Sequence, residues 1–363
     1  MTMQQIGVVA AALAVALIVT LLTTPVVKSL AQKWGAVDVP KDNRRMHDHP
    51  IPRMGGLAIF LGFILSVLLF VPLDTQLRGM LLGAVIIVVL GIFDDIYALG
   101  AMLKFVVQIL AALVAVLAGN KIEVISNPNV FSANPYWELG WLAVPATVIW
   151  VVAITNAVNL IDGLDGLAVG VSTISSMTLL VIALVVSEGR VALLMAALAG
   201  ACIGFMPYNI NPAKIFMGDT GSTFLGYVLA VVSIQGLFKF YTIISFAVPF
   251  LMLGLPLFDT CFAFIRRIAH GQSPMHADRS HVHHRLIDMG FSQKQAVAVL
   301  YVISAILGLS AVVLTTSGPL KAMLLLFALC VAGGVAARLF VTANEKKNGK
   351  STAHGGGDEE EDQ

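Results

Sequence analysis

The sequence predicts an all-α, polytopic integral membrane protein with about eleven transmembrane helices. Hydrophobic residues make up 58% of the 363 residues and charged residues only 12%, whereas a soluble domain is roughly 45–50% apolar and about 25% charged. A soluble chain could not bury this excess, but a bilayer can accept it. Apolar runs close to the length that spans a membrane, about 20 residues, also recur along almost the whole chain.

Eleven apolar runs account for the predicted helices. In order along the chain they cover 6–27, 55–71, 79–93, 102–119, 139–155, 167–187, 191–206, 221–238, 243–265, 296–315 and 320–341. The runs 79–93 and 191–206 are short and adjoin polar motifs. The first run is long enough to span and lacks both a basic start and a small-residue cleavage site. We therefore expect it to form a membrane helix and not a cleaved signal peptide.

The positions of Lys and Arg predict the orientation of these helices. Basic residues gather in the cytosolic loops of membrane proteins. If the N-terminus lies outside, 17 of the 22 Lys and Arg residues fall on the inner side. We therefore predict an outside N-terminus and a cytosolic C-terminus for a multi-pass protein of the inner or plasma membrane. Residues 1–343 are expected to form one membrane domain, and the polar, acidic segment 344–363 a disordered cytosolic tail.

Charge, cysteines and polar residues narrow the class further. A net charge of +1 gives no indication of a nucleic-acid partner. The three cysteines lie inside apolar runs, which argues against a disulfide framework and a zinc site. A charge in the bilayer core costs about 2.5–3.5 kcal/mol, yet polar side chains gather at the inner ends of the runs. We expect them to form one shared site facing the cytosol.

The first candidate motif is GIFDDIYALGAMLKFVVQ, 91–108. Asp94 and Asp95 end one predicted helix, and Lys104 begins the next, where it shares a face with Gln108. Paired carboxylates beside a lysine suit a metal and a phosphate. The alternative is structural, with Asp95 capping a helix and Lys104 extending its side chain to the membrane surface.

The second motif is NAVNLIDGLDGLAVG, 156–170. Asn156, Asn159 and Asp162 recur every three residues and share one helix face. Their oxygens, with those of Asp165, can bind a hard metal ion or hydrogen-bond a nucleotide. A helix end with polar caps is the structural alternative. Four such groups at a bilayer edge exceed what a cap requires, which favours a functional site.

The third motif is NPAKIFMGDTGSTFLG, 211–226. Asp219 stands between two glycines just before an apolar helix. The N-terminus of a helix binds phosphate through its free N–H groups, or Asp219 could hold a Mg²⁺ ion that bridges a diphosphate. With Thr220 and Ser222 beside it, Asp219 is also compatible with an ordinary helix N-cap.

The fourth motif is PMHADRSHVHHRL, 274–286. It brings together His276, Arg279, His281, His283, His284 and Arg285. No convincing tetrahedral zinc set completes it, and a phosphate-binding basic loop fits better. A loop that is basic only because it is cytosolic would not need four histidines. For Asp259, upstream in run 243–265, pairing with Arg266 or Arg267 and a functional role remain equal alternatives.

Together and in this order, the four motifs resemble those of the polyprenyl-phosphate N-acetylhexosaminyl-1-phosphate transferase family. The matching segments are DDIYALGAMLK, NAVNLIDGLDGL, FMGDTGS and HADRSHVHHRL, and the basic segment RRMHDHPIPRMGG, 44–56, is similar to the family's first inner loop. The resemblance extends from residue 28 to about residue 340. The His-loop form is similar to that of the enzymes that initiate wall teichoic acid, enterobacterial common antigen and O-antigen chains.

The resemblance implies a reaction, its substrates and a metal ion. N-acetylglucosamine 1-phosphate would pass from UDP-N-acetylglucosamine to undecaprenyl phosphate, with release of UMP. Asp219 and Asn159 would bind Mg²⁺, with Mn²⁺ as an alternative ion. The residues expected to take part in catalysis are Asp94, Asp95, Lys104, His281, His283, His284 and Arg285, and those expected to bind substrate are Arg53, Asn156, Asn159, Asp162, Asp165 and Arg279. We also consider that the protein could form a homodimer.

Two other functions remain as alternatives. The near relative within the family is the phospho-N-acetylmuramoyl-pentapeptide transferase of peptidoglycan synthesis, from which the His-loop form points away. From another class, a multi-span transporter would carry polar groups near the middle of the membrane. Here the polar groups gather at one face, and the chain has no evident paired halves, which favours the transferase.

Overall fold

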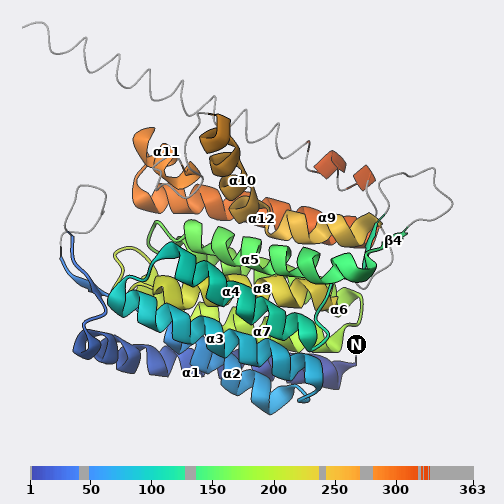
Figure 1. The fold of residues 1–363 in the computed structure, drawn as a ribbon, viewed down its shortest axis with the longest axis horizontal. Coiled ribbons are helices and arrows are strands. Elements are labelled where there is room, and N and C mark those ends of the chain that lie inside the picture. Colours follow the sequence, from blue (N-terminus) through green and yellow to red (C-terminus); the bar gives the residue numbers. More distant parts are fainter. Residues whose placement is uncertain are drawn as a thin grey trace, which may run out of the picture.

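The computed structural model describes residues 2–40, 49–126, 136–236, 243–269 and 281–317, together with positions 320, 321, 323–325 and 327. Most of the predicted run 320–341, the predicted tail 344–363, His276 and Arg279 lie outside these residues. Within them the long helices lie side by side along one direction, and the start of α1 lies at the right-hand end of Figure 1.

The described elements are almost entirely helical. In order they are α1 (Met3–Trp34), β1 (Val37–Asp38), β2 (Ile51–Pro52), α2 (Gly56–Phe70), α3 (Thr75–Tyr97), α4 (Ala101–Leu117), β3 (Val124–Ser126), β4 (Tyr136–Glu138), the 3₁₀ turn η1 (Gly140–Leu142), α5 (Ala143–Leu160), α6 (Leu167–Val185), α7 (Gly189–Asn209), α8 (Gly218–Gly236), α9 (Ile243–Met252), α10 (Gly254–Ala269), α11 (Val282–Asp288) and α12 (Gln293–Ser317). The four strands form two short antiparallel pairs, β1 with β2 and β3 with β4.

By length and composition, six of the described helices can cross a membrane, counting η1 and α5 as one continuous segment. They are α1, α3, η1–α5, α6, α7 and α12, and α2 and α4 are shorter apolar helices. On α1, Ile18, Leu22 and Val26 are 52%, 67% and 68% exposed. A row of large apolar side chains on an outer face is stable against lipid but not against water. These observations confirm the predicted all-α membrane protein.

The fourth motif, predicted as a basic loop, contains most of helix α11, and the predicted run 243–265 is not one continuous helix. The structure divides it at Leu253 into α9 and α10, and Figure 1 shows α10 turned away from the common direction of the bundle. Pro256 has no N–H to donate to the carbonyl four residues earlier, and its ring crowds that carbonyl. The break between α9 and α10 therefore follows from Pro256, whose effect on the helix is not visible in the number of apolar residues. The short runs 79–93 and 191–206 form the long helices α3 and α7. Helix α3 extends into the first motif, and α7 ends just before the third.

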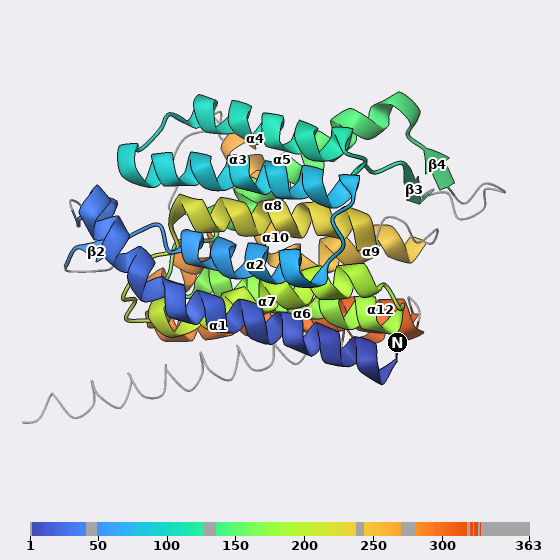
Figure 2. The ribbon, with the colours of Figure 1, turned by 90° about the horizontal axis from the view of Figure 1, so that it is seen from below.

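Helix α8 runs through the middle of the bundle (Figure 2). Phe224, Tyr227 and Val228 on this helix are fully buried. Glycines let the neighbouring helices approach closely, as is common between membrane helices. A Cβ on Gly226 would lie 2.7 Å from the Cα of Thr155 on α5, and one on Gly91 of α3 would collide with Thr220. The first turn of α8 is thus enclosed by other helices.

The β1–β2 hairpin positions the basic segment that precedes α2. Pro52 pairs with Val37, and the Arg53 N–H donates to the Ala36 carbonyl at 2.8 Å. On its other side the Pro52 carbonyl accepts from the Phe216 N–H at 2.8 Å, and the Gly55 N–H donates to the Phe216 carbonyl at 2.9 Å. This backbone pairing brings Arg53 next to the start of α8.

Candidate active site

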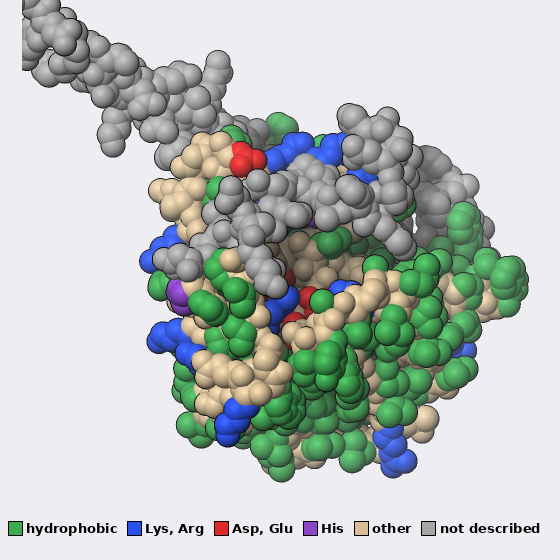
Figure 3. All heavy atoms as spheres, turned by 60° about the vertical axis from the view of Figure 1, so that its left-hand side comes forward, with side chains coloured by type: hydrophobic (Ala, Val, Ile, Leu, Met, Phe, Trp, Pro, Cys, Tyr) green, Lys and Arg blue, Asp and Glu red, His purple; other side chains and the backbone are tan. Residues whose placement is uncertain are grey.

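The predicted site residues that the structure describes come together at one end of the bundle. The end of α3, the start of α4, the end of α5 and the start of α8 meet there, and α11 lies at the same end, on the left of Figure 1. Figure 3, which brings this end forward, shows acidic and basic side chains at the bottom of a hollow. The prediction of a single face for the polar groups agrees with this placement.

Asp95 binds the N-terminus of α8. Its side chain is fully buried. The carboxylate accepts from the N–H groups of Asp219 and Thr220 at 3.0 and 3.1 Å and from the Thr220 hydroxyl at 2.7 Å. The first N–H groups of a helix have no partner within the helix, so Asp95 caps α8 from another helix. The sequence predicted a helix cap for Asp95 as one alternative, but not this helix.

Gly218 makes this cap sterically accessible. Its φ of +71° lies in the left-handed region, which residues with a side chain rarely adopt. A Cβ at this position would also collide with the Asp95 carboxylate, 2.6 Å from Oδ1. Gly218 therefore allows both the turn that begins α8 and the approach of Asp95 to it.

Lys104 bridges two of the three aspartates. Its ammonium donates to Asp94 Oδ2 and to Asp219 Oδ2, at 2.9 Å in each case. Asp94 also accepts from the Leu99 N–H at 2.7 Å, which ties it to the loop between α3 and α4. The predicted association of carboxylates and a lysine is present, and its third member comes from a motif 115 residues further along the chain.

Arg53 adds a second positive charge to this group. Its Nε lies 3.5 Å from Asp95 Oδ1, and its Nη2 lies 3.8 Å from Asp219 Oδ1. Burial opposes ionisation, but the carboxylates of Asp95 and Asp219 outweigh it and raise the pKa of Arg53. We call Asp94, Asp95, Asp219, Lys104 and Arg53 the carboxylate cluster.

The two asparagines of the second motif face different partners. The Asn156 amide donates to Gln108 Oε1 at 2.6 Å and to the Val152 carbonyl at 2.8 Å, so it joins α5 to α4. The Asn159 amide donates to the Ser222 hydroxyl at 2.8 Å, one turn beyond Asp219 on α8. Asn159 thus reaches the first turns of α8, next to the carboxylate cluster.

Asp162 and Asp165 lie in the turn between α5 and α6 but differ in their surroundings. Burial and the negative charges of Asp219 and Asp95 raise the pKa of Asp162 to about 7, against the opposing charge of Arg53. Asp165 instead accepts from the Asn211 amide at 2.9 Å and from the Ala213 N–H at 3.0 Å. The charges of the carboxylate cluster therefore act on Asp162, whereas Asp165 holds the connection between α7 and α8.

The histidines lie at the start of α11, against the turn between α5 and α6. His281 and His283 are buried, and their rings lie parallel, 5.7 Å apart at 6°. The His283 Nε2 contacts Gly163 so closely that a Cβ there would collide with it. Burial and the adjacent His284 lower the pKa of His283 to about 4, although Asp259 acts in the opposite direction.

The basic residues of the fourth motif are not all described. The Arg285 guanidinium lies 5.4 Å above the Phe262 ring of α10, and His284 packs against His283 with ring centroids 4.3 Å apart. Arg279 lies outside the described residues, so its proposed substrate contact stays a prediction.

Several residues at this end were not in the predicted site. Gln108 and Ser222 bind the two asparagines, and Thr220 binds Asp95. The Tyr301 hydroxyl donates to the Gly166 carbonyl at 2.5 Å and so joins α12 to the turn. Gln108 and Thr220 lie inside the predicted motifs, where their polarity is the available signal. Tyr301 lies in an apolar run and gives none.

The residues of the cluster suit a hard metal ion in their chemistry. Mg²⁺ prefers carboxylate, amide and water oxygens, and carboxylates of Asp94 and Asp219 already converge on one cation, the Lys104 ammonium. The side-chain NH₂ group of Asn159 donates to Ser222, so its side-chain oxygen can bind another partner. In the described part of the chain, no three His, Cys, Asp or Glu side chains are close enough to form a metal site of their own.

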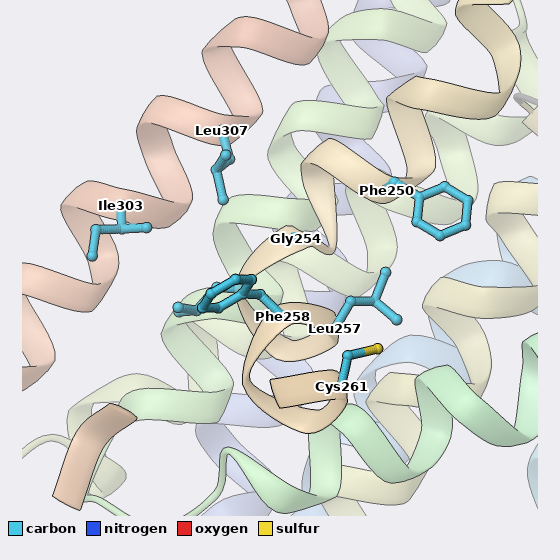
Figure 4. Close-up of a pocket in the computed structure, with 8 residues that line it drawn as sticks. Phe250, Gly254, Leu257, Phe258, Cys261, Ile303 and Leu307 are labelled. Atoms are coloured by element: carbon cyan, nitrogen blue, oxygen red, sulfur yellow. The ribbon is translucent and has the colours of Figure 1, made fainter. Parts of the chain in front are cut away.

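A separate cavity of about 460 Å³ lies between α10 and α12. It is lined by Phe250, Gly254, Leu255, Leu257, Phe258, Cys261, Ile303 and Leu307 (Figure 4). Apart from the Cys261 thiol, these side chains carry only carbon and hydrogen. The cavity therefore suits a hydrocarbon and not a sugar nucleotide.

The fold and the cluster define a multi-span membrane protein that groups acidic and basic side chains at one end of its helices. The model of glycosyl transferase family 4 matches residues 77–237, from α3 to α8, and so includes all three aspartates of the cluster. The chain belongs to this family, because it also aligns over most of its length with phosphotransferases that are 45% and 35% identical to it.

Three relatives give the range of similarity. The probable undecaprenyl-phosphate N-acetylglucosaminyl 1-phosphate transferase of Bacillus subtilis (strain 168) is 45% identical over 335 residues, 92% of each chain. The decaprenyl-phosphate N-acetylglucosaminephosphotransferase of Mycolicibacterium smegmatis is 35% identical over 314 residues, 79% of this chain and 77% of the relative. The phospho-N-acetylmuramoyl-pentapeptide-transferase of Moorella thermoacetica is 34% identical over 238 residues, 61% of this chain and 74% of the relative.

Proposed function

We propose that this chain transfers N-acetylglucosamine 1-phosphate from UDP-N-acetylglucosamine to undecaprenyl phosphate and releases UMP. The observation that carries the proposal is the carboxylate cluster, in which Lys104 and Arg53 meet three aspartates at the start of α8. The named activity of the Bacillus subtilis relative, whose similarity extends over 92% of both chains, supports the same reaction. The product is a lipid-linked diphosphate sugar that can start a cell-envelope glycan.

The chemistry requires two anions to meet. An oxygen of the lipid phosphate attacks the β-phosphorus of the donor. The bond from that phosphorus to the bridging oxygen breaks, and UMP leaves with this oxygen. In this proposal Lys104 and Arg53 lower the repulsion between the anions and stabilise the charge that develops on the leaving phosphate. Asp94 and Asp219 hold the Lys104 ammonium where it can do so. We expect direct attack without a covalent enzyme intermediate.

Mg²⁺ is part of the proposal, with Mn²⁺ as an alternative. Asp219 and Asn159 would hold the ion, because both reach the first turns of α8 and offer oxygen ligands. When bound there, it would neutralise charge on the donor's diphosphate. Asp162 lies in the turn between α5 and α6, and the histidines of α11 pack against this turn. We place the nucleotide and sugar of the donor next to these residues.

The membrane arrangement follows from the two substrates. The long chain of the acceptor lies in lipid, whereas the sugar nucleotide is cytosolic, so the site must sit at the cytosolic face. We propose about eleven membrane helices with the N-terminus outside, which places 17 of the 22 Lys and Arg residues on the cytosolic side. The apolar cavity of α10 and α12 offers a surface for hydrocarbon of the acceptor or of a membrane lipid.

Two rival functions are less well supported. The pentapeptide transferase of Moorella thermoacetica covers 61% of this chain, against 92% for the Bacillus subtilis relative. A transporter would hold its polar groups near the middle of the membrane, but the carboxylate cluster lies at helix ends. Neither rival accounts for the residues as well as the N-acetylglucosamine 1-phosphate transferase.

The test is a donor panel with purified protein in detergent. Undecaprenyl phosphate is incubated with Mg²⁺ and each radiolabelled UDP-sugar, including the muramoyl-pentapeptide donor, and labelled lipid and UMP are measured. We expect UDP-N-acetylglucosamine to be used best. Equal or better use of the pentapeptide donor would assign the other branch, and no transfer from any donor would reject the transferase. Light scattering on the same sample tests the expected homodimer.

A further inference from the structure

Asp259 on α10 is a buried carboxylate outside the carboxylate cluster, and its side chain is only 4% exposed. It makes two short hydrogen bonds to a segment 22 and 23 residues further along the chain. Its Oδ2 lies 2.8 Å from His281 Nδ1, and its Oδ1 accepts from the Val282 N–H at 2.8 Å. Both oxygens therefore face the start of α11, although the sequence suggests Arg266 or Arg267 as partners.

The bond to His281 determines which ring nitrogen carries the proton. An ionised carboxylate can only accept hydrogen bonds, so Nδ1 of His281 must be the donor. A neutral imidazole with its proton on Nδ1 has a lone pair on Nε2. The carboxylate thus fixes both the orientation of the ring and its tautomer, in the way that buried carboxylates orient histidines in other sites.

His281 in turn lies against the residue that contacts the turn between α5 and α6. The His283 ring is parallel to that of His281, and its Nε2 is buried against Gly163, with no hydrogen-bond partner within the described residues. Gly163 follows Asp162 in the turn between α5 and α6. A continuous set of contacts therefore runs from Asp259 through two imidazoles to the turn that borders the cluster.

We infer that Asp259 is a positioning residue for the transfer reaction, which it serves by holding His281 with Nδ1 protonated and Nε2 available to substrate. The inference rests on the proposed function. The competing explanation is that Asp259 only caps α11. His281 is the N-cap residue of α11, and its own side chain makes no capping bond. The Val282 N–H therefore depends on Asp259.

The two bonds can be broken separately. Asp259→Asn keeps the size of the side chain but presents one oxygen and one NH₂ group, so it cannot accept from both donors. Val282→Pro removes the N–H that Asp259 Oδ1 accepts and keeps an apolar side chain of similar size at this partly buried position. Proline is favoured at the first position of a helix, and His281 before it has the extended backbone, φ −61° and ψ 151°, that a residue preceding proline requires. The imidazole bond remains intact in that variant.

The measurement is kcat and KM for the UDP-sugar that wild type uses best, with full-length protein in detergent and undecaprenyl phosphate as acceptor. We expect Asp259→Asn to lower kcat by about 10- to 100-fold, the range found when the hydrogen-bonding partners of metal-binding histidines are removed. KM should change little. Val282→Pro should stay within about 3-fold of wild type. Asp288→Asn, which removes an exposed carboxylate from the other end of α11, is the matched control and should leave kcat unchanged.

A double-mutant cycle tests whether Asp259 acts through His281. We expect Asp259→Asn to have less than about a 2-fold effect in a His281→Ala background, because interacting residues are strongly non-additive. Equal losses in both backgrounds, or a Val282→Pro variant as impaired as Asp259→Asn, would overturn the positioning role and leave a capping role. If Asp259→Asn does not accumulate as folded protein, Val282→Pro is compared with His281→Ala. A loss of kcat in His281→Ala alone supports the positioning role, and an equal loss in both variants leaves a capping role. Lack of turnover by wild type with every donor would reject the proposed function instead.

Discussion

The cap that Asp95 forms on α8 can be tested by replacing it with asparagine. The carboxylate accepts two backbone N–H groups and the Thr220 hydroxyl. The amide of asparagine has one oxygen. Whichever way it is turned, its NH₂ group must face a donor from Asp219 or from Thr220. The first turn of α8 carries Asp219, so we expect the substitution to displace the group proposed to bind Mg²⁺.

The size of the effect follows from the bonds that are lost. A hydrogen bond to a charged group contributes about 1.5–3 kcal/mol. Asparagine loses at least one such bond and weakens the others, so we estimate about 3 kcal/mol. If all of it is lost in the transition state, turnover falls by roughly 100-fold, because about 1.4 kcal/mol corresponds to a factor of ten. Thr220→Val, which removes only the hydroxyl donor, should cost about 1.5 kcal/mol, the lower end of this range, or roughly 10-fold.

The assay compares wild type, Asp95→Asn and Thr220→Val at pH 6.5 and pH 8.5 with saturating Mg²⁺. A residue that positions α8 is needed equally at both values. A residue that acts as a base for the lipid phosphate is needed less at pH 8.5, because a phosphate monoester has a second pKa near 6 and is then already dianionic. We expect the same loss at both values. Recovery of Asp95→Asn towards wild-type activity at pH 8.5 would refute the positioning argument and favour a base.

Three other predictions concern the metal, the pH dependence and the topology. Asp219→Asn should remove Mg²⁺-dependent turnover while the protein remains folded in the membrane, and substantial activity in this variant would place the metal elsewhere. Because the pKa of Asp162 is raised to about 7, its protonated form stabilises the fold. That contribution is complete below about pH 4 and is lost as the pH rises through 7. The thermal midpoint should therefore fall between pH 5 and pH 8, and less so in Asp162→Asn; equal slopes would argue against this assignment. Reporter fusions after residues 130 and 280 should read outside and inside, and the reverse at 280 would contradict a cytosolic site.

The long helices of this protein were predictable because each one has a local signal, whereas the short α11 lies in a motif predicted as a loop. A membrane helix satisfies its own backbone and needs about 20 apolar residues, so a contiguous stretch of sequence contains the information. Ten of the eleven predicted runs correspond to described helices, of which 243–265 is broken in two at Leu253. The break was less predictable, because Pro256 interrupts the hydrogen bonds without lowering the apolar count of the run.

The sequence predicted which residues belong to the site but not which of them bind one another. The motifs and their placement at helix ends indicated that Asp94, Asp95, Lys104 and Asp219 belong together, since charged groups are costly elsewhere in a membrane. No local rule could assign Lys104 to an aspartate 115 residues away. The cap that Asp95 forms on α8 likewise depends on how α3 packs against α8.

Sequence patterns do not show how the helices pack, and this also explains the residues whose surroundings were unexpected. Asp162 and Asp165 are three positions apart in one motif, yet the charges of the carboxylate cluster act on the first, and the second binds Asn211 and Ala213. The sequence by itself determined a polytopic membrane bundle with a polar site at one end, because hydrophobicity and charge act on each segment separately. Only the tertiary structure decided which aspartate holds a helix, which one the charges of the carboxylate cluster act on, and that Asp259 binds His281. Hydrogen bonds act over about 3 Å, and the packing of helices sets which side chains come that close.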